Sequence, residues 1–315
     1  MLKKIIIGLL MTVGVHACSK EGRLTPSCLD KNWYAIENKP GDLNQLLYKI
    51  YKEYDCSVFY KDTIGKEYRG LDGNGDSIIY YETLKIGYFI SGKSNIHYTL
   101  TDRKDRLMAG AKILYESILP ELKKRKLIPR SILLTDTIRL EERANKAWYV
   151  KKTMTGLLLG SVIEKAEGDY LNIEDMTEIQ KKEVKGRIMA SMFLENLMNT
   201  EFEYLDKEFL SIITEETGVE FIYERSYYDN NEEYHKPVEE LGFITWGYSV
   251  KKKGFTGTWL IYKKTVSKKQ DIEDFMAVVL GIEEDAFSQR YKEFPIVMKK
   301  YRWMKNFLKE KKILE

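Results

Sequence analysis

Few side chains in this sequence are equipped for metal or nucleophilic chemistry. The chain has 315 residues but only 3 His and 3 Cys, and none of them stands at a metal-ligand spacing. There is no G-x-S-x-G elbow, no catalytic cysteine context and no Walker loop. His97 and His235 are isolated in the sequence, so each is expected to be an ordinary surface or hydrogen-bonded residue. The remaining candidates are two carboxylates on predicted helices, Glu195 and Glu273.

Glu195 belongs to a segment, residues 183–199, that predicts a buried helix. At about 100° per residue its apolar side chains spread over most of the circumference. Glu195 is expected to project on the apolar side, between Val184 and Ile188. A carboxylate there is costly unless it is paired, hydrogen-bonded or bound to an ion. The alternative is that Glu195 reaches solvent at the helix end, or pairs with Lys or Arg.

Glu273 belongs to a second acid-rich segment, residues 270–280, that also predicts a helix. Asp271 is expected to cap it, and Glu273 and Asp274 would lie in its first turn, where the helix dipole favours anions. This explanation accounts for all three acids without any catalytic role.

Other elements follow from hydrophobic spacing and turn residues. The turn at 70–76 has Asp72, Asn74 and Asp76 at the spacing of calcium ligands, but Ser77 and Thr83 stand where that loop needs Gly and Glu. It is expected to be a plain Asp/Asn/Gly turn. Helices are expected over 43–54, 107–122 and 299–315, and strands over 58–60, 78–81, 132–134, 148–150 and 156–162.

Three late motifs appear in a set order after the predicted 183–199 helix. They are Glu-Glu-Leu-Gly-Phe-Ile at 239–244, Glu-Asp-Phe at 273–275 and Ile-Val-Met-Lys-Lys-Tyr at 296–301. In this order the chain resembles the zinc metallopeptidase-like lipoproteins of Bacteroidetes, the substrate-import-associated zinc metallohydrolase lipoproteins. The resemblance covers about residues 110–310 and rests on the order and spacing of the motifs.

The resemblance implies an α+β, zincin-like metallopeptidase-type domain with a mixed sheet and a buried central helix. It matches Glu195 to the catalytic base of an HExxH motif and Glu273 to a later metal ligand. The two histidine positions are then Leu194 and Met198, and neither side chain is a useful zinc ligand. The resemblance therefore implies a degenerate site without zinc or catalysis. No cofactor is expected, and zinc would enter only if the motif is misaligned.

The first residues predict a targeting signal. A basic start, an apolar stretch and Val15-His16-Ala17-Cys18 are typical of a lipoprotein signal at 1–17, with Cys18 lipidated. The alternative is an ordinary cleaved signal peptide. Residues 18–40 are expected to form a tether, and 41–315 a single metallopeptidase-like domain. By similarity to known lipoproteins, Ser19 suggests the outer membrane, with the domain facing the periplasm or the cell surface.

Two further features leave alternatives open. Cys28 and Cys56 could pair in an oxidising compartment, or remain buried free thiols.

The segment 223–262 is crowded with aromatic residues, of which Trp246, Tyr248 and Trp259 are candidates for binding a peptide or glycan. The alternative is that most of these rings belong to a hairpin packed on the core.

The net charge and the family resemblance limit the classes of partner that are expected. The net charge is only +3, which gives no general argument for nucleic acid. The resemblance implies a TonB-dependent transporter complex as the partner. Three functions stay open, namely a non-catalytic binding component of nutrient import, a metal-dependent hydrolase with an atypical site, and a structural envelope lipoprotein. The basic residues of 299–315 are expected to be solvated on an amphipathic helix, with contact to an anionic membrane as the alternative.

Overall fold

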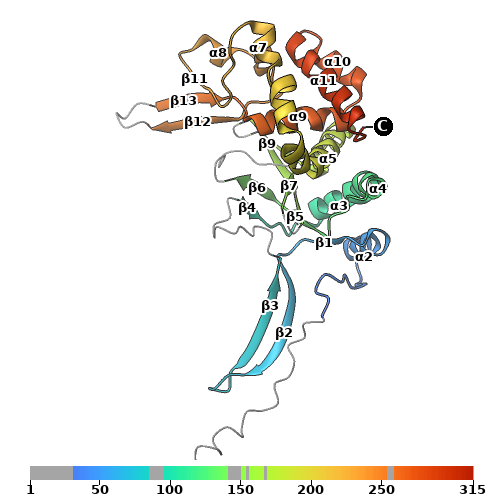
Figure 1. Ribbon diagram of the computed structural model, residues 1–315. Coiled ribbons are helices and arrows are strands. Elements are labelled where there is room, and N and C mark those ends of the chain that lie inside the picture. Colours follow the sequence, from blue (N-terminus) through green and yellow to red (C-terminus); the bar gives the residue numbers. More distant parts are fainter. Residues whose placement is uncertain are drawn as a thin grey trace, which may run out of the picture. The chain divides into compact units, whose positions relative to one another are not determined.

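A mixed four-stranded sheet forms the framework of the protein (Figure 1). Its strands β1 (Ser57–Phe59), β5 (Ser131–Thr135) and β8 (Leu157–Gly160) are parallel, and β7 (Val150–Lys152) pairs antiparallel with β8 at one edge. β5 and β8 are buried along their whole length, which is typical of parallel strands covered on both faces. The mixed sheet and the α+β class are as predicted.

The computed structural model describes residues 31–84, 96–140, 150–153, 156–166, 169–253 and 259–314. The chain forms two units, Met1–Trp33 and Tyr34–Glu315. In the first unit, the ammonium of Lys31 lies 4.1 Å from the ring centroid of Trp33. The helices and strands of the described residues belong to the second unit. Cys18 and Cys28 lie outside the described residues, so the lipidation of Cys18 stays a prediction.

Four smaller antiparallel sheets accompany the central one in the described part of the chain. Their strands are β2 (Thr63–Leu71) with β3 (Ser77–Thr83), β4 (Ile96–Thr99) with β6 (Thr137–Leu140), β9 (Val162–Ala166) with β10 (Asp169–Asn172), and β11 (Ser226–Tyr228) and β12 (Tyr248–Lys253) on either side of β13 (Trp259–Lys264).

The described residues form ten α-helices, of which the five longest lie where hydrophobic spacing predicts helices, whereas those at 202–205, 212–217, 232–235 and 284–291 were not predicted. The ten helices are α2 (Asp42–Tyr54), α3 (Lys104–Ile113), α4 (Leu119–Lys124), α5 (Glu178–Thr200), α6 (Phe202–Leu205), α7 (Ile212–Thr217), α8 (Glu232–His235), α9 (Lys268–Gly281), α10 (Glu284–Tyr291) and α11 (Pro295–Glu310). Single turns of other helix types are η1 (Leu114–Ile118), η3 (Ile173–Asp175), η4 (Asp206–Leu210) and η5 (Val238–Leu241).

Alternate residues of the central strands enter two different cores, because successive side chains of a strand point to opposite faces. Ile132 and Leu134 of β5 join the core formed with α2, α3 and α5. Leu133 of β5 joins a smaller core with Ile96 and Ile138 of the β4–β6 ribbon. Helices therefore cover one face of the sheet and the β4–β6 ribbon packs against the other.

α5 connects this first core to a second, mainly helical one. It starts with a capping box, in which Thr177 and Gln180 each bond the other's backbone N–H. Val184 and Ile188 pack toward the sheet, whereas Leu194 and Leu197 pack against α9 and α11. The predicted buried helix is confirmed, and it is buried because it lies between two cores.

α5 and α9 approach each other closely enough for their backbones to touch. A Cβ built on Gly186 of α5 would lie 2.1 Å from the carbonyl oxygen of Ala277, and one on Gly281 would lie 2.4 Å from the carbonyl oxygen of Lys182. Only glycine fits at such distances, so these two residues set the spacing of the helix pair.

Three local predictions have clear outcomes. The 70–76 turn is a plain turn, because the Asp72 carboxylate accepts the backbone N–H groups of Asn74 and Asp76 at 2.8 and 2.9 Å. Cys56 is a free, buried thiol, and burial raises its pKa to about 12. The N-cap of α9 is Ser267 rather than Asp271, because the helix begins earlier than predicted and Ser267 accepts the backbone N–H of Gln270.

Candidate functional site

The acidic residues of α9 lie against α5 and α11 and form the main polar cluster of the helical core. Asp271 and Asp274 have only 1% exposure each, although a first-turn helix position predicts solvent contact. Burying a carboxylate is unfavourable unless it is paired and hydrogen-bonded. Both are paired in the folded chain, with cations from different helices.

Asp271 pairs with Lys300 of α11, which is fully buried. The Lys300 ammonium donates to the two carboxylate oxygens of Asp271 at 2.7 and 2.5 Å and to the carbonyl oxygen of Gly242 at 3.1 Å. The Tyr223 hydroxyl donates to the same carboxylate at 2.8 Å. Burial raises the pKa of Asp271 and lowers that of Lys300, and the attraction between the two charges opposes both effects.

Three aromatic rings surround the Lys300 ammonium. The centroid of Phe275 lies 4.6 Å from it, and those of Phe209 and Phe243 lie 4.9 Å from it. Such rings attract a cation through their negative faces. The sequence-based expectation that Lys300 is solvated is therefore wrong. It stands three residues after buried Val297 and four before buried Met304, and this spacing within the apolar face of α11 was the available signal.

Asp274 pairs with α5 instead. The Arg187 guanidinium donates to one of its oxygens at 2.8 Å, and the Thr245 hydroxyl donates to the other at 2.8 Å. Both carboxylate oxygens of Asp274 are thus occupied by protein donors. Together the two buried carboxylates connect α9 to α5, to α11 and to the segment that follows η5.

Glu195 lies on the surface of α5, not on its apolar side. Its side chain is 66% exposed and lies 3.5 Å from the Lys269 ammonium. The expectation of an apolar environment is wrong, because the two cores leave a polar stripe on α5 that includes Glu195 and Asn196. The alternative, pairing with a lysine, is confirmed.

The two positions matched to the HExxH histidines face the protein interior. Leu194 is buried and belongs to the core around α9 and α11, and Met198 packs partly against the same core. A metal site needs its ligands to converge on one accessible point. Position 194 faces the core whereas the Glu195 side chain faces solvent, so a ligand at 194 and the carboxylate of Glu195 would not face a common point.

Glu273 differs from the other two acids of α9. It is half-buried, and among the described residues it makes no hydrogen bond or ion pair. Burial and the neighbouring Asp274 raise its pKa, whereas Arg187, Lys151 and Lys269 lower it. Lys269 thus forms an ion pair with Glu195 and also lowers the pKa of Glu273, so the two candidate residues share one neighbouring cation.

Replacing Glu273 with glutamine is expected to raise the free energy of unfolding at pH 7 by about 0.5–1 kcal/mol, because it removes a half-buried charge that has no partner among the described residues. The folded-state pKa of Glu273 lies above the ordinary value of 4.5, so its charge costs stability as pH rises through that range. The advantage of Glu273→Gln should therefore shrink between pH 7 and pH 4. Urea unfolding of the variant and of the unsubstituted chain at both pH values measures this difference in the free energy of unfolding. Glu195→Gln, at an exposed ion pair, should change stability by less than about 0.5 kcal/mol and serves as the control.

The histidines stand apart from this cluster. His97 lies opposite Arg139 in the β4–β6 ribbon and is exposed. His235 is exposed at the end of α8, and its Nε2 lies 3.0 Å from the carbonyl oxygen of Asp229. Within the described ranges, no three His, Cys, Asp or Glu side chains converge as a metal site would require.

The candidate binding aromatics belong to the β11-β13-β12 sheet and the turn before it. Trp246 is half-buried, contacts the edge of Tyr227 and lies beneath the Lys263 ammonium, 5.3 Å from its centroid. Tyr248 begins β12 and Trp259 begins β13, and their side chains lie outside the described part of the structure. Phe243 and Tyr227 are core residues, as the alternative predicted for most of these rings, but Phe243 precedes β12 and Tyr227 lies in β11 instead of in a hairpin. Tyr228 is 44% exposed.

A second charged cluster lies beside the carboxyl end of β5 and was not found from the sequence. Arg106 of α3 donates to Asp136 at 2.6 Å, to Asn172 at 2.8 Å and to Glu174 at 3.0 Å. These residues come from distant parts of the chain and carry no common motif. Arg106 occupies the centre of the cluster, and Asp136 and Glu174 neutralise its charge.

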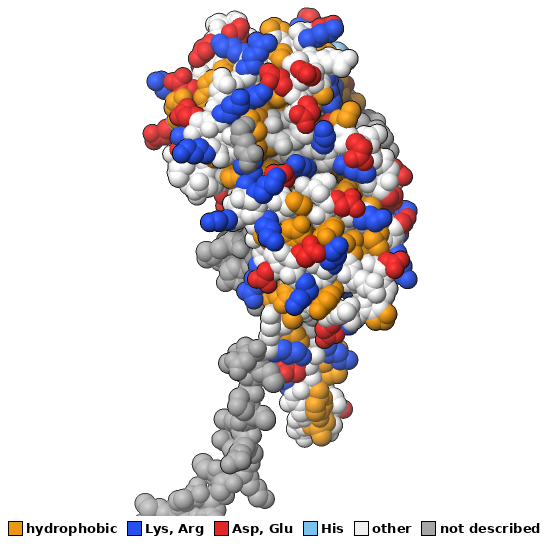
Figure 2. Space-filling model, turned by 90° about the vertical axis from the view of Figure 1, so that its right-hand side faces the viewer, with side chains coloured by type: hydrophobic (Ala, Val, Ile, Leu, Met, Phe, Trp, Pro, Cys, Tyr) orange, Lys and Arg blue, Asp and Glu red, His pale blue; other side chains and the backbone are white. Residues whose placement is uncertain are grey.

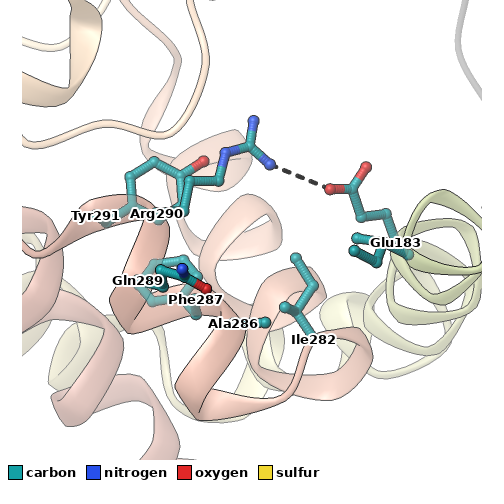
Figure 3. Close-up of a pocket in the computed structure, with 8 residues that line it drawn as sticks. Glu183, Ile282, Ala286, Phe287, Gln289, Arg290 and Tyr291 are labelled. Carbon is teal, nitrogen blue, oxygen red and sulfur yellow. Dashed lines mark hydrogen bonds and ion pairs between the residues drawn. The ribbon is translucent and has the colours of Figure 1, made fainter.

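A pocket of about 370 Å³ lies between α5 and α10, away from Glu195 and Glu273. Figure 3 shows Glu183 and Arg290 facing each other across its rim, where their charged groups approach to 3.3 Å. Ile282, Phe287 and Tyr291 form much of its wall. It is largely apolar, and it contains none of the residues that the sequence predicted for chemistry.

Comparisons with protein-family models, with curated proteins and with solved structures gave no match to this chain. Among the described helices, none has both the length and the apolar character needed to cross a membrane.

Proposed function

We propose that this chain is a lipid-anchored envelope protein with a metallopeptidase-like architecture that binds rather than catalyses, as an accessory component of outer-membrane nutrient import. One observation carries the proposal. Three acids of the two helices that would hold a zinc site are engaged by the protein's own cations, Glu195 by Lys269, Asp274 by Arg187 and Asp271 by Lys300, whereas Glu273 has no such partner among the described residues.

The chemistry of a zinc hydrolase needs an activated water and free ligands around the metal. Imidazoles are lacking at 194 and 198, and the first of these positions is buried in the core. The pairing of Glu195, Asp271 and Asp274 with Lys or Arg replaces the charge that a metal would supply to these three acids. This pattern supports a role for the cluster in holding α5, α9 and α11 together.

Binding is supported by the aromatic and basic segment around β11-β13-β12. Tyr228 is exposed and its ring lies 5.4 Å from that of Tyr262, and Trp246 is half-buried under Lys263. Aromatic rings with polar edges suit a peptide or glycan ligand. Charges of both signs alternate over the face in Figure 2, which supports a partner other than nucleic acid.

Three lysines of α11 and its C-cap are paired with acids, which argues against their use in a basic membrane patch. Lys299 pairs with Glu216 at 2.7 Å, Lys311 pairs with Glu201 at 2.9 Å, and Lys305 pairs with Glu284. With those charges balanced internally, membrane attachment rests on Cys18. We place the protein at the outer membrane, in contact with a TonB-dependent transporter.

The test is fractionation of the full chain expressed in a Gram-negative host, beside its Cys18→Ser variant. The unsubstituted chain should enter the outer-membrane fraction, and the variant should become soluble, because one cysteine carries the anchor. Cross-linking of native membranes should then join the anchored chain to a TonB-dependent transporter. Equal distribution of the two forms, or cross-links that consistently exclude transporters, would contradict the proposal.

A second candidate function rests on Glu273 alone. A half-buried carboxylate with a raised pKa, and without a partner among the described residues, suits an acid–base group, as a metal-dependent hydrolase with an atypical site would need. It would predict that Glu273→Gln abolishes an activity, whereas the binding proposal predicts only a small gain in stability.

A further inference from the structure

The β2–β3 hairpin exposes an unusual number of large apolar side chains. They are Tyr68 at 61%, Leu71 at 60%, Ile78 at 44%, Ile79 at 38% and Tyr81 at 52% exposure. Figure 2 shows hydrophobic side chains gathered along this hairpin, at the lower end of the coloured surface. Contiguous apolar surface of this kind marks an interaction site.

The two faces of the hairpin differ in chemistry. Tyr68 lies opposite Ile79 and Lys66 lies opposite Tyr81, so these four side chains share one face. The other face holds Ile78 and a polar network, in which Arg69 stacks 3.6 Å from the Tyr80 centroid and Tyr80 donates to Glu82. The apolar face therefore has no partner of its own within the hairpin.

Among the described residues, no strand pairs with the outer edge of β3. β2 and β3 form a sheet of two strands in the described structure, and β2 carries irregular register near Leu71, whereas β3 is regular from Ser77 to Thr83. β3 reads Ser-Ile-Ile-Tyr-Tyr-Glu-Thr, with one charge and no proline. Such an edge readily accepts another strand. A two-stranded sheet alone is marginally stable, and further strands stabilise it.

The sequence of β3 is complementary to itself in one antiparallel register. With Tyr80 on the two-fold axis, Ile79 lies opposite Tyr81 of the second copy, and Ile78 lies opposite its Glu82. No like charges then meet, since the two Glu82 side chains stand about 13 Å apart along the strands. Pairs of aromatic and β-branched residues are favourable across strands. The apolar faces of both hairpins become one continuous four-stranded face.

We propose that β3 pairs antiparallel with β3 of a second copy of this chain, about a two-fold axis at Tyr80, to form a homodimer with a four-stranded sheet. This inference is independent of the anchor and of the ligand. A closed two-fold contact of this kind uses up both exposed edges.

Cysteine cross-linking tests the register. In the full mature chain with Cys18→Ser and Cys28→Ser, Tyr80→Cys should form a disulfide-linked dimer, because residues opposite on paired strands have Cα atoms about 4.5–5.5 Å apart. Glu82→Cys is the matched control, and it should remain monomeric under the same oxidation. Equal cross-linking of both variants, or of neither, would overturn the proposal.

Sedimentation of the chain without new cysteines gives a second, independent readout. The mass should be that of two chains, and Ile79→Lys should reduce it to that of one. Ile222→Lys, at a 62% exposed position outside the hairpin, should leave the dimer intact. A monomer, including one that binds vesicles of phosphatidylethanolamine and phosphatidylglycerol through the hairpin, would overturn the proposal.

Discussion

Replacing Lys300 with methionine is expected to lower the free energy of unfolding by about 3–5 kcal/mol, because it leaves the Asp271 carboxylate buried without its cation. Methionine preserves most of the volume among the Phe209, Phe243 and Phe275 rings, so the loss is mainly electrostatic. The carbonyl oxygen of Gly242 also loses its donor. Chemical unfolding followed by circular dichroism measures the change.

Two further variants separate charge from packing at this position. Combining Lys300→Met with Asp271→Asn removes both charges and keeps an acceptor for Tyr223, so it should recover at least about 2 kcal/mol of the loss. Lys299→Met, at the adjacent exposed ion pair, should cost less than about 1 kcal/mol. If Lys300→Met and Lys299→Met have the same small effect, the buried pair does not organise the helical core.

Replacing Gly186 with alanine is expected to cost about 3 kcal/mol or more. The new Cβ would lie 2.1 Å from the carbonyl oxygen of Ala277 and 2.8 Å from the Cα of Gly281, and both contacts are backbone atoms of α9 that cannot rotate away. α5 and α9 would have to separate, which also strains the Arg187–Asp274 pair one residue further along α5. Thermal unfolding and the yield of folded protein measure the effect.

Gly110→Ala in α3 is the matched control. Its Cβ would meet a methyl carbon of Leu134 at 3.4 Å, an ordinary contact with a side chain that can adjust. Alanine favours a helix over glycine by up to about 1 kcal/mol, so this variant should keep or gain stability. Equal stability of the Gly186→Ala and Gly110→Ala variants would show that the close contact of α5 with α9 is unimportant.

Elements with a strong hydrophobic period were predictable from the sequence, and pairings between distant side chains were not. The apolar residues of 183–199 predict a buried helix, and the short apolar runs of β5 and β8 predict buried strands. The pattern gave no information on which core each side of α5 contacts. Glu195 was therefore assigned to an apolar side, although it lies on the polar stripe that the two cores leave open.

The acids of α9 illustrate the limit more sharply. The helix dipole favours acids in the first turn, which is enough to explain why Asp271 and Asp274 are acidic, and a first-turn position predicts that they are exposed to solvent. Their burial depends on Lys300 and Arg187, which stand 29 and 87 residues away in the chain. The spacing of residues along the sequence does not predict such distant partners. The one local indication was the position of Lys300 within the apolar face of α11.

The proposed function implies that Glu195, Asp271 and Asp274 bind the protein's own cations, and that the acids of α5 and α9 do not form a zinc site. The most direct measurement is the zinc content of the purified mature domain, lacking Cys18, after incubation with zinc and removal of excess metal. We predict a ratio of zinc to protein near zero, unchanged in a Glu195→Gln, Glu273→Gln variant. A ratio near one that falls in this variant, together with peptide cleavage that depends on Glu195, would contradict the proposed function.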